Sequence, residues 1–132
     1  MSVIDSIKVH EGFCPKPYPD PLLGWNKPTF GYGFTWLSEE EADYLLARRI
    51  DSITTELART LPFFGGASQN VRDVLIEMAY QLGTRGLLKF KKMLAAIEAG
   101  DYVAAGKEMK ASSWAIQTPN RVKELATRLQ SF

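Results

Sequence analysis

Residues 14–36 read CPKPYPDPLLGWNKPTFGYGFTW, a segment unlike the rest of the chain. Prolines and glycines recur in it at short intervals, and aromatic side chains stand between them. Helices do not tolerate such spacing, whereas short strands joined by turns commonly show it. The segment therefore predicts a small, loop-rich hairpin or sheet.

Helices are expected on both sides of this segment. Apolar residues at helical spacing precede Gly12 and predict a short amino-terminal helix that ends at Glu11. Downstream, Ser38 and Glu41 form a capping box, in which each side chain can satisfy the backbone N–H of the other residue. A helix should begin there and end at Leu61-Pro62.

More helices follow toward the carboxy terminus. Ser68 caps a helix whose apolar stripe is stopped by Gly83, and Thr118 caps the last helix, with Pro119 in its first turn. The remaining ranges expected to be helical are Leu87–Ala99, Tyr102–Lys110 and Pro119–Leu129. The sequence thus predicts one α+β domain over residues 1–132, with a small β-hairpin lobe between an amino-terminal helix and a helical bundle.

The composition is that of an ordinary globular domain, with 132 residues, 45% hydrophobic and 23% charged. Cys14 is the only cysteine and His10 the only histidine, which excludes an internal disulfide and zinc sites built from several Cys and His ligands. No apolar run is long enough to cross a bilayer, and the first residues lack a signal pattern. We therefore expect a soluble product made in the cytoplasm, without stable membrane insertion.

Charge is distributed unevenly, although the net charge is only +1. Residues 1–84 carry 7 basic and 11 acidic side chains, and residues 85–132 carry 9 and 4. A basic segment can steer a protein toward an anionic polymer such as bacterial cell wall or nucleic acid. It can equally be a solvated helical face, so the asymmetry alone does not choose a partner.

Two carboxylates and a hydroxyl are placed around the hairpin segment: Glu11, Asp20 and Thr29. A glycosidase needs such a set, because one carboxyl group protonates the leaving oxygen while a second group handles the attacking water or the developing positive charge. The chain contains 15 Asp and Glu residues, however, and most carboxylates in a soluble domain are solvated surface groups. The residue types alone therefore leave the three residues as a hypothesis.

A wider pattern gives this hypothesis a family. The motifs Glu11-Gly12, Tyr18-x-Asp20 and Thr29-x-Gly31-Tyr32-Gly33 resemble the active-site segment of the phage-type lysozymes of glycoside hydrolase family 24. The likeness continues, in the family's order, through Met78–Gly83, Gly86, Phe90, and Ser112–Arg121. It implies a lysozyme-like domain with a shortened β-lobe at about 13–36 and a helical lobe at about 38–132 plus the amino-terminal helix.

The resemblance also implies an activity. The chain would be a muramidase that hydrolyses the β-1,4 bond between N-acetylmuramic acid and N-acetylglucosamine in peptidoglycan, with inversion and with no metal or cofactor. Glu11 would be the general acid, while Asp20, helped by the Thr29 hydroxyl, would orient the attacking water. A phage-like origin suggests an endolysin for host lysis: a monomer in the host cytoplasm that reaches the wall through a holin or membrane damage.

Four more residues are implied in substrate binding: Gly33, Tyr80, Gln81 and Arg121. Tyr80 either lines the saccharide cleft or packs in the core, and Gly33 either lets the backbone approach substrate or forms an ordinary turn.

Arg121 falls in the first turn of a helix, where the helix dipole disfavours a positive charge, so it needs a specific partner. The family pattern points it toward Glu11, where it would lower that acid's pKa; the alternative is a solvated arginine. The two large aromatics Trp114 and Phe90 are expected in the core.

Two departures from the family pattern bear on this reading. Eight residues separate Asp20 from Thr29, whereas the family commonly has five, and a hairpin that bulges outward would restore the geometry. Phe34 stands where relatives have a histidine, so we expect aromatic packing in place of an ion pair. The longer insert motivates one alternative, a wall-binding module that has lost catalysis. Others are a lytic transglycosylase, against which Asp20 and Thr29 argue, and a basic nucleic-acid module; we expect no nucleic-acid partner.

Overall fold

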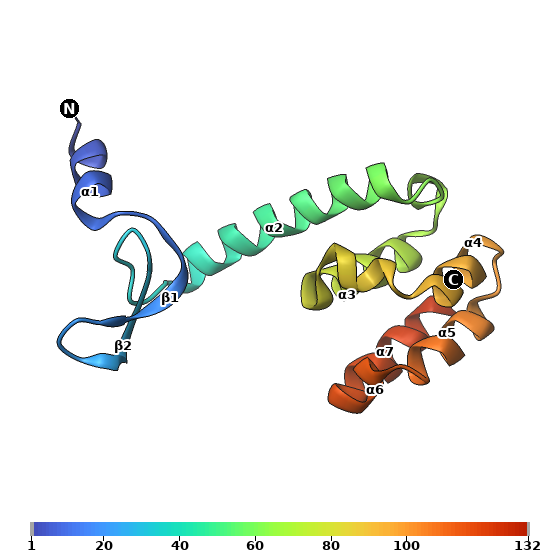
Figure 1. The fold of residues 1–132 in the computed structure, drawn as a ribbon. Coiled ribbons are helices and arrows are strands. Elements are labelled where there is room, and N and C mark those ends of the chain that lie inside the picture. Colours follow the sequence, from blue (N-terminus) through green and yellow to red (C-terminus); the bar gives the residue numbers. More distant parts are fainter. Residues whose placement is uncertain (1, 132) are drawn as a thin grey trace. The chain divides into compact units, whose positions relative to one another are not determined.

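The computed structural model describes residues 2–131 (Figure 1). In chain order its elements are α1 (Val3–Glu11), β1 (Cys14–Asp20), β2 (Gly24–Gly31), α2 (Glu39–Thr60), the 3-10 helix η1 (Phe64–Gly66), α3 (Gln69–Leu88), α4 (Lys91–Glu98), α5 (Tyr102–Lys110), α6 (Ser113–Gln117) and α7 (Pro119–Leu129). A hairpin between an amino-terminal helix and a helical region confirms the predicted α+β class. The chain divides into two compact units, residues 1–45 and 46–132. That these form one lysozyme-like domain stays a prediction.

Strands β1 and β2 pair antiparallel, as the segment 14–36 predicted. Pro15, Pro17 and Pro19 fall at every second position of β1, so the missing N–H groups can all lie along one edge of the strand. A two-stranded hairpin has a free outer edge where no ladder donor is required. Proline there also discourages pairing with a foreign strand.

A bulge in β2 accommodates the long insert. Tyr18 pairs with Thr29 and Asp20 with Gly24, so one residue on β1 faces four on β2. The surplus of three residues equals the excess of this insert over the five that the family commonly has. A bulge is therefore present where the insert predicted one, and Tyr18 still pairs with Thr29; that the bulge projects outward stays a prediction.

The helices α2 and α3 begin where the sequence predicted. At the start of α2, the Ser38 hydroxyl accepts the Glu41 N–H and the Glu41 carboxylate accepts the Ser38 N–H, each at 3.1 Å. The Ser68 hydroxyl accepts the Val71 N–H at 3.3 Å and caps α3. The core then forms from α2, α3 and the carboxy-terminal helices. Its largest fully buried side chains are Leu57, Leu75, Met78, Leu87, Met93, Met109, Leu125 and Leu129.

Two helix boundaries differ from the prediction. Gly83 does leave helical geometry, with φ 76°, but α3 resumes and continues to Leu88. The expected helix Leu87–Ala99 is wrong in extent, because Leu87 is fully buried as part of α3 and α4 begins only after Phe90. The backbone of Phe90 is not helical, and its ring packs edge-on against Trp114 with centroids 6.0 Å apart.

The segment before α7 contains the short helix α6, which the sequence did not predict. Buried Trp114 anchors it, which confirms the core assignment of that residue; Phe90 is half-buried against the same core. Thr118 stands at the expected cap position, but capping by its side chain is wrong: the hydroxyl donates to the Trp114 carbonyl at 3.2 Å. Its hydroxyl therefore satisfies a backbone carbonyl of α6. Pro119 lies in the first turn of α7 as predicted.

Within residues 2–131, no helix is both long and apolar enough to span a membrane.

Candidate active site

Glu11 is the last residue of α1, and both ends of that helix are fixed. At its start, the Ser2 hydroxyl accepts the Asp5 N–H at 3.1 Å while the Asp5 carboxylate accepts from Ser2. At its end, Gly12 adopts φ 68° and donates its N–H to the Lys8 carbonyl at 2.9 Å. The helix therefore stops directly after Glu11 and leaves this exposed carboxylate at the junction with the hairpin.

The Glu11 carboxylate lies directly on Gly33. A Cβ added to Gly33 would stand 2.5 Å from Oε2 and 2.9 Å from Cδ of Glu11, closer than real side chains approach. Gly33 also has φ 77°, a conformation that favours glycine. The glycine therefore provides the space in which the predicted acid sits. It remains a prediction that its backbone also approaches substrate.

Aromatic contacts join α1 to the turn that carries Gly33. The Lys8 ammonium stands over the Tyr32 ring, 5.4 Å from its centroid, and Phe13 packs on the same ring with centroids 5.5 Å apart. A cation over an aromatic face contributes roughly 0.5–1 kcal/mol at an exposed site. Lys8 and Phe13, which lie before and after Glu11 in the chain, both contact Tyr32, the residue before Gly33. These contacts keep Glu11 next to Gly33.

Phe34 closes the turn by the aromatic packing that the sequence predicted. Phe30 and Phe34 exchange two backbone hydrogen bonds of 2.9 and 2.7 Å, and their rings meet edge-on with centroids 5.9 Å apart. Gly31 makes room for this contact, since a Cβ there would lie 2.7 Å from the Phe34 ring. The contact between the Phe30 and Phe34 rings thus stabilises the turn that contains Gly31 and Gly33.

Asp20 and Thr29 lie on the hairpin. Thr29 pairs with Tyr18, and Asp20 lies two residues further along β1, beyond the register shift of the bulge. Asp20 Oδ1 accepts the N–H groups of Leu22 and Leu23 at 2.8 and 2.9 Å, which fixes the carboxylate and leaves Oδ2 free of those bonds. Thr29 is buried, only 8% exposed, and its hydroxyl donates to the Lys27 carbonyl at 3.3 Å.

The hydrogen bonds from Leu23 and then Leu22 lower the pKa of Asp20 below its usual range. We expect Asp20 to stay ionised at pH values where ordinary aspartates take up a proton. A carbon-detected NMR titration of its carboxyl group measures this, and Leu23→Pro, which removes one N–H, should raise the pKa while Leu22→Ala should not. Because folding lowers this pKa, the stabilisation is present above the usual range and is lost as the pH falls through the folded-state value. Titration of Asp20 in the usual range would contradict the prediction.

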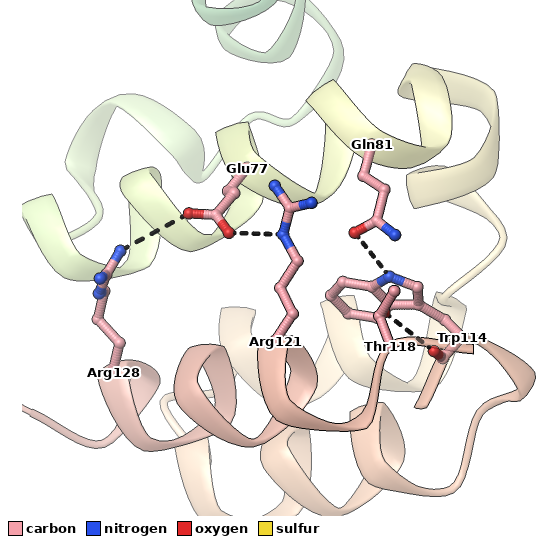
Figure 2. Close-up of polar contacts among 6 residues, drawn as sticks. All are labelled: Glu77, Gln81, Trp114, Thr118, Arg121 and Arg128. Atoms are coloured by element: carbon pink, nitrogen blue, oxygen red, sulfur yellow. Dashed lines mark hydrogen bonds and ion pairs between the residues drawn. The ribbon is translucent and has the colours of Figure 1, made fainter. Parts of the chain in front are cut away.

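In the second unit, Arg121 has a partner that the sequence did not reveal (Figure 2). Its Nε donates to Glu77 Oε2 at 2.8 Å, from the first turn of α7 to the middle of α3. The other oxygen of Glu77 lies 4.0 Å from a terminal nitrogen of Arg128. The predicted need of Arg121 for a specific partner is thus met by Glu77; an approach of Arg121 to Glu11 stays a prediction.

The two α3 residues predicted to bind saccharide differ in their surroundings. Tyr80 is 44% exposed, which rules out its core alternative, and it contributes to a groove of about 440 Å³. Gln81 is half-buried, and its side-chain oxygen accepts the indole N–H of Trp114 at 3.0 Å (Figure 2). That bond fixes the amide and orients its nitrogen. Among residues 2–131, no three His, Cys, Asp or Glu side chains gather as a metal site.

Comparison with known proteins identifies the family. Residues 8–131 match the family model described as phage lysozyme. The chain is 28% identical over 99 residues to probable T4-type lysozyme 1 of Dictyostelium discoideum, covering 72% of this chain and 58% of that protein. It is 32% identical over 85 residues to probable T4-type lysozyme 2 of the same organism, covering 64% and 50%. A third relative is the pre-baseplate central spike protein Gp5 of Enterobacteria phage T4, 29% identical over 92 residues, covering 67% of this chain and 16% of Gp5.

The chain therefore belongs to the phage lysozyme family. Its matched segment spans about half the length of the two Dictyostelium relatives. The match begins at residue 8 and so includes Glu11, the hairpin and the helices that carry Glu77 and Arg121.

Proposed function

We propose that this chain is a peptidoglycan-degrading muramidase that hydrolyses the β-1,4 bond between N-acetylmuramic acid and N-acetylglucosamine with inversion. The observation that carries the proposal is the Glu11 carboxylate lying against Gly33, directly after the hairpin that bears Asp20 and Thr29. Family membership supports the same reaction class. The Glu11 side chain is exposed at the end of α1, as a group that protonates a substrate must be.

The proposed reaction follows from the three side chains. Protonated Glu11 gives its proton to the glycosidic oxygen as the bond to the anomeric carbon breaks. A water molecule attacks that carbon from the opposite face, and Asp20, ionised and with Oδ2 free of its turn bonds, accepts a proton from this water. The Thr29 hydroxyl donates to the Lys27 carbonyl, so its lone pairs are directed to accept from the same water.

Substrate binding is proposed for Tyr80, Gln81, Gly33 and Arg121. The exposed Tyr80 ring suits the apolar face of a sugar, and the fixed Gln81 amide suits a hydroxyl or acetamido group. The biological setting would be lysis of a bacterial host by a monomeric endolysin that passes from the cytoplasm to the wall after a holin permeabilises the membrane.

Mass spectrometry of fragments released from purified peptidoglycan in ¹⁸O-water tests the reaction. Hydrolysis predicts reducing-end muramic acid that carries one ¹⁸O atom. An anhydro product without ¹⁸O would assign a lytic transglycosylase instead, because no water enters that product. Binding to the wall without any release would assign a catalytically inactive module.

A further inference from the structure

Lys8 and Glu11 lie side by side at the end of α1. They are three positions apart, a spacing that places two side chains on the same face of a helix. Their contacts on the turn are also adjacent, because the Lys8 ammonium stands over the Tyr32 ring and the Glu11 carboxylate lies against Gly33, the next residue. The ammonium is therefore within reach of Glu11, yet within residues 2–131 no ion pair joins the two side chains.

The Tyr32 ring can hold this cation against the competing carboxylate. At an exposed site, a cation–π contact and a surface ion pair are similar in strength. The helical pair is also in its less favourable order, because the lysine precedes the glutamate. Phe13 packs on the same ring, with centroids 5.5 Å apart, and limits the movement of the ring. The balance therefore favours the position of Lys8 over the ring.

The position of the Lys8 ammonium matters for a general acid. A cation beside a carboxyl group stabilises its ionised form, and an ionised Glu11 has no proton to give to a leaving oxygen. We propose that Tyr32 is a positioning residue, whose ring holds the Lys8 ammonium off Glu11 and so preserves the protonated acid. The inference rests on the proposed function. Tyr32 acts here through Lys8 and need not touch substrate.

Replacing Tyr32 by leucine should release Lys8 onto Glu11. Wall clearing is measured across pH and divided by the rate of the unsubstituted chain at each pH, so that titration of the substrate cancels. Tyr32→Leu should lower the rate about twofold to fivefold at pH values where only a fraction of the acid is protonated, the loss expected from one surface ion pair. The loss should vanish toward acidic pH, where the acid is protonated in both chains, and it should shrink at high salt. Tyr32→Phe, which keeps the ring but lacks the titratable hydroxyl, should match the unsubstituted chain.

Removal of the lysine charge separates this role from plain packing. Lys8→Met in the Tyr32→Leu chain should restore the rate, because no cation then reaches Glu11 from that position. The matched control is Lys16→Met in the same background, which removes the charge of an exposed lysine on β1 and should not restore the rate.

The other titratable groups that bear on Glu11 are the same in all these chains. They are His10, the preceding residue of α1, and Arg121, which the family pattern points toward this carboxylate. Their influence therefore cancels in the comparison. A loss of equal size at every pH, or a Tyr32→Leu chain that Lys8→Met does not restore, would overturn the proposal, since both results describe lost packing.

A carbon-detected NMR titration of the Glu11 carboxyl group separates this inference from the proposed activity. Tyr32→Leu should move the titration to lower pH, and Lys8→Met should return it. An inactive chain that shows both shifts would sink only the proposed hydrolysis, and an active chain that shows neither would sink only this inference. Circular dichroism verifies that each variant is folded. Tyr32→Met, which keeps more contact with Phe13, takes the place of Tyr32→Leu if the leucine variant does not fold.

Discussion

Glu11→Gln should reduce wall hydrolysis by about 10²- to 10⁴-fold, the range that a general acid contributes. Glutamine keeps the size of the side chain and its packing on Gly33 but cannot give a proton to the leaving oxygen. Clearing of a suspension of purified peptidoglycan measures the rate. The variant should fold normally, and it should be no less stable, because Glu11 lies at the carboxy-terminal end of α1 where the helix dipole disfavours a negative charge.

The matched control is Glu40→Gln, the same substitution at another exposed carboxylate of the first unit. It should clear the wall at the rate of the unsubstituted chain. Equal activity of the Glu11 and Glu40 variants would refute the assignment of Glu11 as the acid. A chain that clears no wall before any substitution would instead favour the wall-binding module.

Much of the fold could be predicted because its decisive signals are local. The capping pair Ser38 and Glu41 satisfies backbone groups three residues apart, and alternate prolines restrict one strand whatever packs around it. The signal that failed for helix α6 depends on distant residues: the helix exists because Trp114 is buried among the helical core, and that contact has no fixed spacing in the sequence. Thr118 failed for another reason, because its hydroxyl has two local options and bonds to the carbonyl four residues before it, on Trp114, instead of capping the next helix.

The candidate site divides in the same way. Glu11 could be placed at a helix end because the glycine that follows it, Gly12, is typical of the position after a helix. The bulge in β2 could be predicted from the number of residues between Asp20 and Thr29. The partnership of Glu77 with Arg121 joins residues 44 positions apart, and a glutamate on an amphipathic helix ordinarily indicates only a solvated face. One signal was available: Arg121 and Arg128 are seven residues apart on one face of α7, which favours an acidic partner opposite.

Gly33→Ala should reduce activity about 100-fold while costing only about 1–2 kcal/mol of stability, the latter from a left-handed backbone that now carries a Cβ. The added methyl would lie 2.5 Å from Glu11 Oε2. Displacing the carboxylate should hardly change the stability, because it is the far end of a flexible and exposed side chain. It should slow the reaction strongly, because a displacement of about 1 Å can reduce the rate 100-fold when a proton must reach one particular oxygen. Wall clearing measures the rate, and thermal unfolding measures the stability.

Gly100→Ala separates the backbone strain from the displacement of the Glu11 carboxylate. Gly100 has nearly the same φ as Gly33, 78°, but no atom lies within 4 Å of an added Cβ. It should lose similar stability and no activity; equal activity of both glycine variants would show that Glu11 does not act from its place over Gly33. A double-mutant cycle sharpens the test. In the Glu11→Gln background, Gly33→Ala should lose most of its effect on activity, because the methyl group acts mainly through the carboxyl group that it displaces; the loss that remains measures the substrate contact proposed for Gly33. A full additional loss would mean that Gly33 contacts substrate directly, the other role predicted for it.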